Sequence, residues 1–297
     1  MFDALSPYGR GIGGRRVMCP PEAIRDSEHF DIVPCGPVLG AEIRGLDLNS
    51  ELSPALVADL KRAFLDWKVL FFRDQSLTAR AHVDLARQWG EPIRYPLPDT
   101  GELPEIVRVE HGPGSPGVEN VWHSDVSYQE IPALGSILHA ITVPPYGGDT
   151  LWADMTAAYD GLPEEIRQRV DGLVAEHDFL ARYQDHDSLA RAKAARDMFP
   201  VHVHPVVRVH PETGRRILYV NRTYTTRILS LDEPESTWLV DLLCGQAYHP
   251  EYQVRFQWSP GAVALWDNRA TQHYATSDYY PHHRLMERVT IAGDRPA

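Results

Sequence analysis

Two side chains capable of binding a metal ion lie in the segment Val121-Trp-His-Ser-Asp-Val126. We predict a strand over residues 118–126, in which side chains alternate between the two faces. His123 and Asp125 then point the same way, about 6–7 Å apart along the backbone. An imidazole and a carboxylate are two members of the 2-His-1-carboxylate set, which holds ferrous iron and leaves other coordination positions open for chemistry. The segment therefore indicates an iron site that needs a second histidine.

The same His-x-Asp pattern occurs twice more, at His29 with Asp31 and at His82 with Asp84. Chance supplies such patterns in a chain with 14 histidines. Apolar residues around His82 repeat at helical spacing, and on a helix His82 and Asp84 diverge by about 200° around the axis. His29 follows a polar stretch with no nearby partner. His123 with Asp125 remains the pair that we expect to chelate a metal.

Two arginines in the segment Arg284-Leu-Met-Glu-Arg288 could bind anions. We predict a strand over residues 285–291. On it Arg284, Met286 and Arg288 share one face, and the two arginines lie roughly 13 Å apart. Buried guanidinium groups are costly unless each has an anion, and arginine suits bidentate recognition of oxyanions. If the face points outward instead, the arginines are solvated, and the composition leaves both interpretations open.

The third metal ligand is not fixed by spacing alone. His273 precedes Arg284 by eleven positions (284 − 273), and a connection of that length could fold the arginine strand back beside the histidine. His273 could then complete the metal site, and Arg284 could anchor an anionic co-substrate. Other histidines remain candidates as well. They are His139, His202, His204, His210, His249, His282 and His283.

Length and composition limit the classes of protein to which the chain could belong. The 297 residues, 43% hydrophobic and 24% charged, fit one large β-rich domain. A formal net charge of −12 argues against nucleic acid or an anionic membrane as the main partner. Three cysteines (Cys19, Cys35 and Cys244) are odd in number and fit free thiols in a reducing compartment. The sequence contains no signal or membrane-span pattern, so we expect a cytoplasmic protein.

The chain is expected to form a mainly β protein with flanking helices around a double-stranded β-helix, or jelly-roll, core. Residues 1–28 are predicted to be a flexible Gly/Arg-rich tail, and residues 29–297 a single domain with a helical insertion at about 155–200. Strands are expected at 69–72, 106–110, 118–126, 133–143, 203–209, 217–221, 252–258, 262–266 and 285–291. Helices are expected at 53–67, 78–89, 155–171, 187–197 and 235–243.

Six sequence blocks occur together in order. They are Trp122-His-Ser-Asp-Val126, Gly147-Gly-Asp-Thr-Leu-Trp152, Glu176-His-Asp-Phe179, His204-Pro-Val-Val-Arg-Val-His210, Trp266-Asp-Asn-Arg-Ala-Thr-Gln-His-Tyr274 and Arg284-Leu-Met-Glu-Arg288. Together they strongly resemble the taurine dioxygenase branch of the iron- and 2-oxoglutarate-dependent dioxygenases. The resemblance runs from about Phe30 to the C-terminus.

The resemblance implies a role for each matching residue. His123, Asp125 and His273 match the iron ligands of the family. Thr150 and Arg284 match the residues that hold the distal carboxylate of 2-oxoglutarate, and Arg288 matches the arginine that receives the substrate sulfonate. The substrate pocket is implied at Val126, Tyr183, Tyr224 and, near a point of divergence, Tyr95. The aromatic residues among these could equally be ordinary core residues.

The activity that the resemblance implies uses Fe(II), 2-oxoglutarate and O2. Hydroxylation beside a sulfonate, with taurine the leading example, would release sulfite and an aldehyde while 2-oxoglutarate becomes succinate and CO2. The chain departs from the taurine enzymes at Ile93-Arg-Tyr-Pro-Leu-Pro98 and at Val118-Glu-Asn-Val121. The same chemistry on an alkyl sulfate, a carboxylate or a larger substrate is therefore an alternative.

Other classes of protein remain open. A jelly-roll metal enzyme that does not use 2-oxoglutarate would have no need of Arg284. A non-catalytic small-anion-binding protein and a hydroxylase of carrier-bound substrates are further alternatives. Related halogenases lack the carboxylate at the position of Asp125, so its presence favours oxygenation. We also expect a homo-oligomer, either a dimer or a tetramer.

Overall fold

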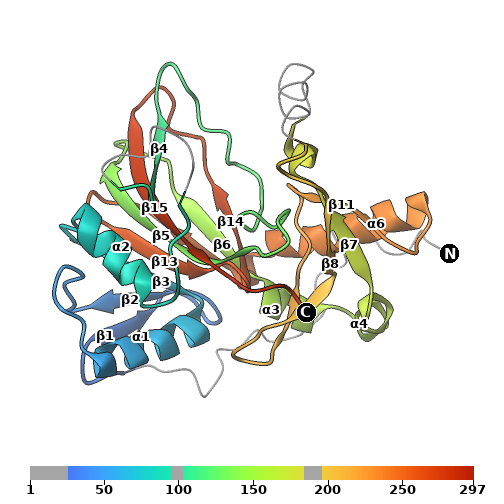
Figure 1. Ribbon diagram of the computed structural model, residues 1–297, viewed down its shortest axis with the longest axis horizontal. Helices are drawn as coiled ribbons and strands as arrows, with labels where there is room; N and C mark the ends of the chain where they lie inside the picture. Colours follow the sequence, from blue (N-terminus) through green and yellow to red (C-terminus); the bar gives the residue numbers. More distant parts are fainter. Residues whose placement is uncertain (1–25, 95–102, 184–195) are drawn as a thin grey trace.

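A seven-stranded sheet organises the computed structural model, which describes residues 26–94, 103–183 and 196–297. Its strand order is β1-β2-β3-β13-β5-β15-β4, and neighbours are antiparallel except β2 and β3 (Figure 1). The strands are β1 (Asp31–Pro34), β2 (Ala41–Arg44), β3 (Val69–Phe72), β4 (Ile106–His111), β5 (Ala133–Thr142), β13 (Val263–Asp267) and β15 (Arg284–Ala292). Every residue of the central strands β3 and β13 is buried. The sheet is therefore covered on both faces at its centre.

Two helices cover one face of this sheet. The helix α1 (Pro54–Trp67) begins at Ser53, whose side chain accepts a hydrogen bond from the Leu56 N–H. The helix α2 (Ala79–Arg87) begins in the same way at Thr78. Both helix starts agree with the sequence prediction. Their apolar stripes pack on the sheet in a cluster that includes Leu60, Phe64, Leu85, Ile137 and Val289.

A three-stranded sheet lies against the opposite face. It contains β12 (Gln253–Phe256), β6 (Thr150–Asp154) and β14 (Thr271–Ala275), in that order. Large aromatic rings fill the space between the two sheets. Phe71 and Phe256 stack at 4.2 Å between ring centroids, and Trp152 and Trp266 pack at 5.8 Å. This aromatic layer fixes the separation of the two sheets.

A smaller lobe lies beyond the three-stranded sheet (Figure 1). It contains the sheet β11-β7-β8 and the hairpin β9-β10, packed with the helices α3, α4 and α6 around a separate apolar cluster. Its elements are α3 (Met155–Gly161), α4 (Glu164–Val170), β7 (Val174–His177), η1 (Phe179–Arg182), β8 (His202–Pro205), β9 (Val207–Val209), β10 (Arg216–Leu218), β11 (Thr225–Ile228), α6 (Glu233–Cys244), η2 (Gly245–Tyr248) and η3 (Pro250–Tyr252). The chain is thus mainly β with helices around the sheets.

Two predictions about individual elements are wrong. The helix expected at 155–171 is two helices, because Leu162, which precedes Pro163, takes an extended conformation. The strand expected at 118–126 is irregular apart from one bridge at His123, followed by a turn that begins at Asp125. The strands predicted on the two sides of residues 210–214 pair with each other as the antiparallel β9 and β10.

Some predictions concern residues outside the described ranges. These include most of the tail at 1–28 and most of the helix at 187–197. Within the described residues, no helix is both long and apolar enough to cross a lipid bilayer.

Candidate active site

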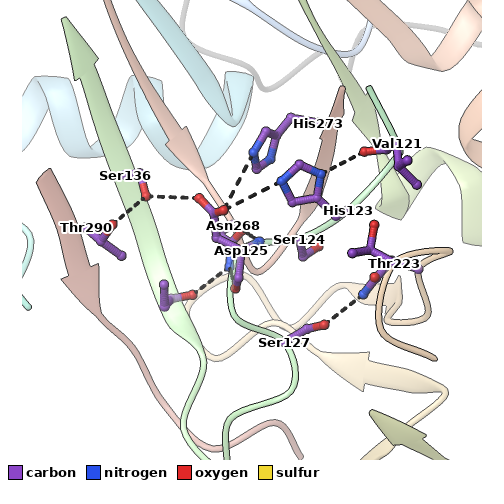
Figure 2. A network of polar contacts seen from close by, with 12 residues as sticks. Val121, His123, Ser124, Asp125, Ser127, Ser136, Thr223, Asn268, His273 and Thr290 are labelled. Carbon is purple, nitrogen blue, oxygen red and sulfur yellow. Dashed lines mark hydrogen bonds and ion pairs between the residues drawn. The ribbon is translucent and has the colours of Figure 1, made fainter. Parts of the chain in front are cut away.

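His123, Asp125 and His273 converge at one point between the two sheets. The His123 Nε2 atom lies 3.7 Å from Asp125 Oδ1, and His273 Nε2 lies 3.8 Å from the same oxygen. Figure 2 shows both imidazole rings turned toward the carboxylate. All three side chains are largely buried, and their donor atoms lie within 4.8 Å of one another. Two imidazoles and one carboxylate in this arrangement could hold a metal ion on one face.

Backbone pairing brings the two histidines together. The His123 N–H donates to the His273 carbonyl at 3.1 Å, and the His273 N–H donates to the His123 carbonyl at 2.8 Å. His273 belongs to β14, whereas His123 meets that strand through this single bridge. The His123 Nδ1 atom lies 2.7 Å from the Val121 carbonyl, so Nδ1 carries the proton and the Nε2 lone pair faces Asp125.

A turn, rather than strand alternation, points Asp125 toward the histidines. Val126 has a φ of 50°, a left-handed conformation that is uncommon for a β-branched residue. The Asn268 side chain holds the turn from across the site: it accepts from the Asp125 N–H at 2.6 Å and donates to the Asp125 carbonyl at 3.0 Å. Figure 2 shows Asn268 behind the carboxylate. This conformation is stabilised by a residue 143 positions away in the chain.

The electrostatic environment keeps these groups in the protonation states that a metal requires. Burial opposes ionisation of Asp125, but the neighbouring Arg288 and the two histidines hold its pKa at about 2. Burial lowers the pKa of His273 to about 3 and also lowers the pKa of His123. At neutral pH the site therefore presents one carboxylate and two neutral imidazoles. This donor set fits a divalent transition metal.

A cavity of about 690 Å³ opens on this cluster, and Arg284 and Thr150 lie in its wall. Arg284 is only 4% exposed, and among the described residues its Nε and Nη2 atoms have no hydrogen-bond partner. Thr150 lies on β6, where its hydroxyl oxygen accepts a hydrogen bond from Trp258 Nε1 at 3.0 Å. A buried guanidinium with free N–H groups is suited to bind an anion that enters the cavity.

Arg288 also faces the cavity, from the same side of β15 as Arg284 and Met286. The inward orientation considered for this strand is therefore the observed one. The Arg288 Nη1 atom lies 3.2 Å from Asp125 Oδ1 and 3.3 Å from Asp125 Oδ2. In this state the second arginine is paired with the carboxylate of the metal-binding cluster.

Three of the residues expected in the substrate pocket line the cavity: Val126, Tyr183 and Tyr224. Burial raises the pKa of Tyr224 to about 12, so its hydroxyl stays protonated. Tyr95 lies outside the described residues. The remaining histidine candidates lie elsewhere. Their hydrogen bonds show this: His202 contacts the Tyr128 carbonyl, His204 the Gln129 carbonyl, His210 the Asp267 carboxylate, His282 the Tyr146 hydroxyl and His283 the Glu110 carboxylate.

Sequence reasoning missed several residues at the site. Asn268 and Ser136 contact Asp125, and Arg182 adds a further cation to the cavity wall beside Arg284 and Arg288. Asn268 lies inside the block 266–274 and follows a predicted buried strand closely. A polar residue in that place was the feature from which its role could have been predicted. Arg182 stands next to the predicted Tyr183, but no motif distinguished it from a surface arginine.

Comparisons with known proteins agree with this geometry. The family model for taurine catabolism dioxygenases, the TauD, TfdA family, matches residues 31–290. An α-ketoglutarate-dependent sulfate ester dioxygenase from Pseudomonas putida is 38% identical, covering 90% of this chain and 91% of its own. An alkylsulfatase from Acinetobacter baylyi is 36% identical, covering 86% and 83%. A solved taurine dioxygenase from Burkholderia xenovorans is 38% identical with a TM-score of 0.79, covering 91% and 93%.

Proposed function

Because the chain belongs to the TauD/TfdA family of taurine catabolism dioxygenases, we propose that His123, Asp125 and His273 bind a ferrous ion. The protein is a 2-oxoglutarate-dependent dioxygenase. One observation carries the assignment of its site: the buried His-His-Asp cluster shares a cavity with a buried, partly unpaired guanidinium, that of Arg284. A metal enzyme without an anionic co-substrate would have no use for that cation.

We assign Arg284 and Thr150 to the distal carboxylate of 2-oxoglutarate. The free Nε and Nη2 atoms of Arg284 provide two donors, which suits a carboxylate. The Thr150 hydroxyl already accepts from Trp258 Nε1, so its own hydrogen remains available to a ligand. When bound, iron and 2-oxoglutarate supply the oxidising power, since O2 oxidises 2-oxoglutarate to succinate and CO2 while a substrate C–H bond is oxidised. The chain supplies position and exclusion of water.

We propose that the substrate carries a sulfate or sulfonate group that binds Arg288. In such a complex the anion would take over contacts that Arg288 now makes with Asp125. Apolar and aromatic residues, among them Val121, Tyr183 and Tyr224, line the remainder of the cavity. This lining supports an organic group larger than the aminoethyl chain of taurine, and the sulfate ester dioxygenase and the alkylsulfatase among the relatives support a sulfate ester. Alkyl sulfates are therefore our first candidates, followed by alkyl sulfonates and taurine.

The reaction balances without a further reductant. One oxygen atom of O2 enters the C–H bond next to the sulfur-bearing group, and the other enters succinate. A hydroxylated sulfate ester then releases an aldehyde and sulfate, whereas a hydroxylated sulfonate releases an aldehyde and sulfite. The proton on the new hydroxyl leaves as the C–O or C–S bond breaks.

We further infer that the two facing sheets form a double-stranded β-helix core, which the likeness to the solved taurine dioxygenase supports. Cytoplasmic location and assembly as a dimer or tetramer stay predictions.

A substrate panel tests the proposal. The full chain is supplied with Fe(II), ascorbate, O2 and 2-oxoglutarate, and each of butyl, hexyl and octyl sulfate, hexanesulfonate, taurine and hexanoate is added separately. Succinate, aldehyde, sulfate and sulfite are measured. We expect aldehyde and succinate in equal amounts with at least one sulfur anion. The substrate assignment would be contradicted if no sulfate or sulfonate increased succinate formation, or if hexanoate were the one compound turned over.

A further inference from the structure

A second cluster of potential metal ligands lies on the other face of the large sheet. His139 on β5 and Glu287 on β15 are direct partners in the strand pairing, so their side chains project from the same face. The helix α2, which contacts both strands, places His82 above them. None of the three lines the cavity of the candidate active site. The cluster is therefore separate from the proposed reaction.

His82 offers a buried nitrogen lone pair. Its Nε2 atom lies 3.1 Å from the Ile137 carbonyl, and since a carbonyl can only accept, Nε2 carries the hydrogen. The other nitrogen, Nδ1, then has a bare lone pair, and the described residues give it no hydrogen-bond partner. His82 is 1% exposed, and burial lowers its pKa to about 3, so the ring is neutral at physiological pH. A backbone carbonyl that fixes the tautomer of a histidine is typical around metal ligands.

His139 and Glu287 supply two further donors. His139 is 6% exposed, and in the described part of the chain its Nδ1 atom also has no partner. The Glu287 side chain is 15% exposed, and its Oε1 accepts from Arg108 Nε at 3.2 Å. One donor atom from each of His82, His139 and Glu287 lies within 4.8 Å of the others.

We propose that His82, His139 and Glu287 bind a zinc-like divalent cation. Two imidazoles and one carboxylate suit Zn²⁺ rather than Ca²⁺ or Mg²⁺, which prefer sets of oxygen ligands. The ion would satisfy the two free imidazole nitrogens and would compete with Arg108 for Glu287. It would tie α2 to β5 and to β15, the strand whose opposite face carries Arg284 and Arg288. Its role is structural, because the ion would link three elements of the fold and two of its ligands, His82 and His139, are buried.

Zinc titration of the full chain tests this site. The variant carrying His123→Ala and His273→Ala removes the proposed iron site, and after chelator treatment we expect it to bind about one Zn²⁺ per chain by calorimetry. Adding Glu287→Gln or His139→Asn to this variant should lower its zinc affinity. The loss should exceed the roughly 10–100-fold that follows when only a residue hydrogen-bonded to a metal ligand is removed. Circular dichroism and the melting temperature without zinc establish that each variant is folded.

Two further variants separate this site from adventitious binding. Arg108→Gln removes the competing cation and should tighten zinc binding. His283→Gln, which disrupts an exposed His–Glu pair with 2.7 Å between His283 Nε2 and Glu110 Oε1, should leave it unchanged. The proposal is overturned if the variant without the iron site binds no zinc, if zinc binding survives Glu287→Gln and His139→Asn, or if His283→Gln abolishes it. None of these results bears on 2-oxoglutarate turnover.

Discussion

The Nη1 atom of Arg288 lies 3.2 Å from one carboxylate oxygen of Asp125 and 3.3 Å from the other. This contact joins the residue that we assign to the substrate anion to a residue that we assign to the metal. The Arg288 charge helps to keep Asp125 ionised despite its burial. It also places a positive charge beside the proposed site of a divalent cation. Substrate binding and metal binding should therefore influence each other through this pair.

Arg288→Gln should separate the two roles. Removing the cation raises the pKa of Asp125, yet at neutral pH that group stays ionised, and less repulsion should tighten divalent-metal binding severalfold. The sulfur-anion substrate loses its anchor, so succinate should form with little matching aldehyde. Anaerobic metal titration and the succinate-to-aldehyde ratio measure both effects. Unchanged coupling would remove Arg288 from the substrate site.

Arg284→Met should abolish 2-oxoglutarate binding without destabilising the ligand-free protein. Burial lowers the pKa of Arg284, and its unpaired N–H groups make the charge costly when no anion is present. An apolar side chain of similar length removes that cost. We expect an equal or higher melting temperature without ligand, and loss of about 2–5 kcal/mol of 2-oxoglutarate binding. The exposed arginine variant Arg295→Met is the control, and comparable losses of metal and 2-oxoglutarate affinity would contradict the assignment.

The ion pair between His111 and Glu119 should make stability depend on pH. His111 Nε2 lies 3.1 Å from Glu119 Oε2, and this ion pair raises the pKa of His111. A raised histidine pKa contributes stability that is fully present below the ordinary value of about 6.5 and is lost as the pH rises through the folded value. Burial opposes ionisation of Glu119, but His111 holds its pKa at about 2, so its contribution is lost only in strong acid.

The corresponding variant is His111→Gln. The natural protein should melt at a higher temperature than this variant, with the largest difference near pH 5.5 and a smaller one toward pH 8.5. The corresponding difference in the free energy of unfolding should be at most about 1 kcal/mol, because Glu119 is one-third exposed. A difference that is independent of pH would show that the pair contributes through packing alone.

Asp267→Asn should destabilise the turn between β13 and β14. Asp267 is buried, accepts two hydrogen bonds from the Arg269 side chain at 2.9 Å and 2.7 Å, and lies 3.0 Å from His210 Nε2. Losing its charge leaves a buried guanidinium without its main anion, which costs about 3–5 kcal/mol. Denaturant unfolding measures the loss. Asp160→Asn, which breaks the exposed pair with Arg215, should cost at most about 1 kcal/mol, and similar losses in both variants would contradict this account.

The sequence singled out His123, Asp125 and His273, which the structure brings together, but not the local geometry that does so. Strand alternation placed His123 and Asp125 on one face, whereas the protein turns at Asp125. The turn depends on the Asn268 side chain and on the left-handed Val126, and both are consequences of tertiary contact. Local patterns contain no information on a partner 143 residues away.

The helices and strands also divide into those that the local sequence predicts and those that it does not. Val69–Phe72 is a strand as predicted, because four consecutive apolar residues are best buried on both faces of a central strand. Thr271–Ala275 was missed as a strand, since its polar sequence resembles a connection although the first three residues are buried. The break between α3 and α4 could have been predicted, because Pro163 disfavours a helical Leu162.

The most direct test is diffraction at the iron absorption edge from crystals prepared without oxygen, with Fe(II) and 2-oxoglutarate. We predict one iron peak at bonding distance, about 2.0–2.2 Å, from His123, Asp125 and His273. The far carboxylate of 2-oxoglutarate should contact Arg284. An iron peak elsewhere, or 2-oxoglutarate bound away from Arg284, would contradict the proposed active site.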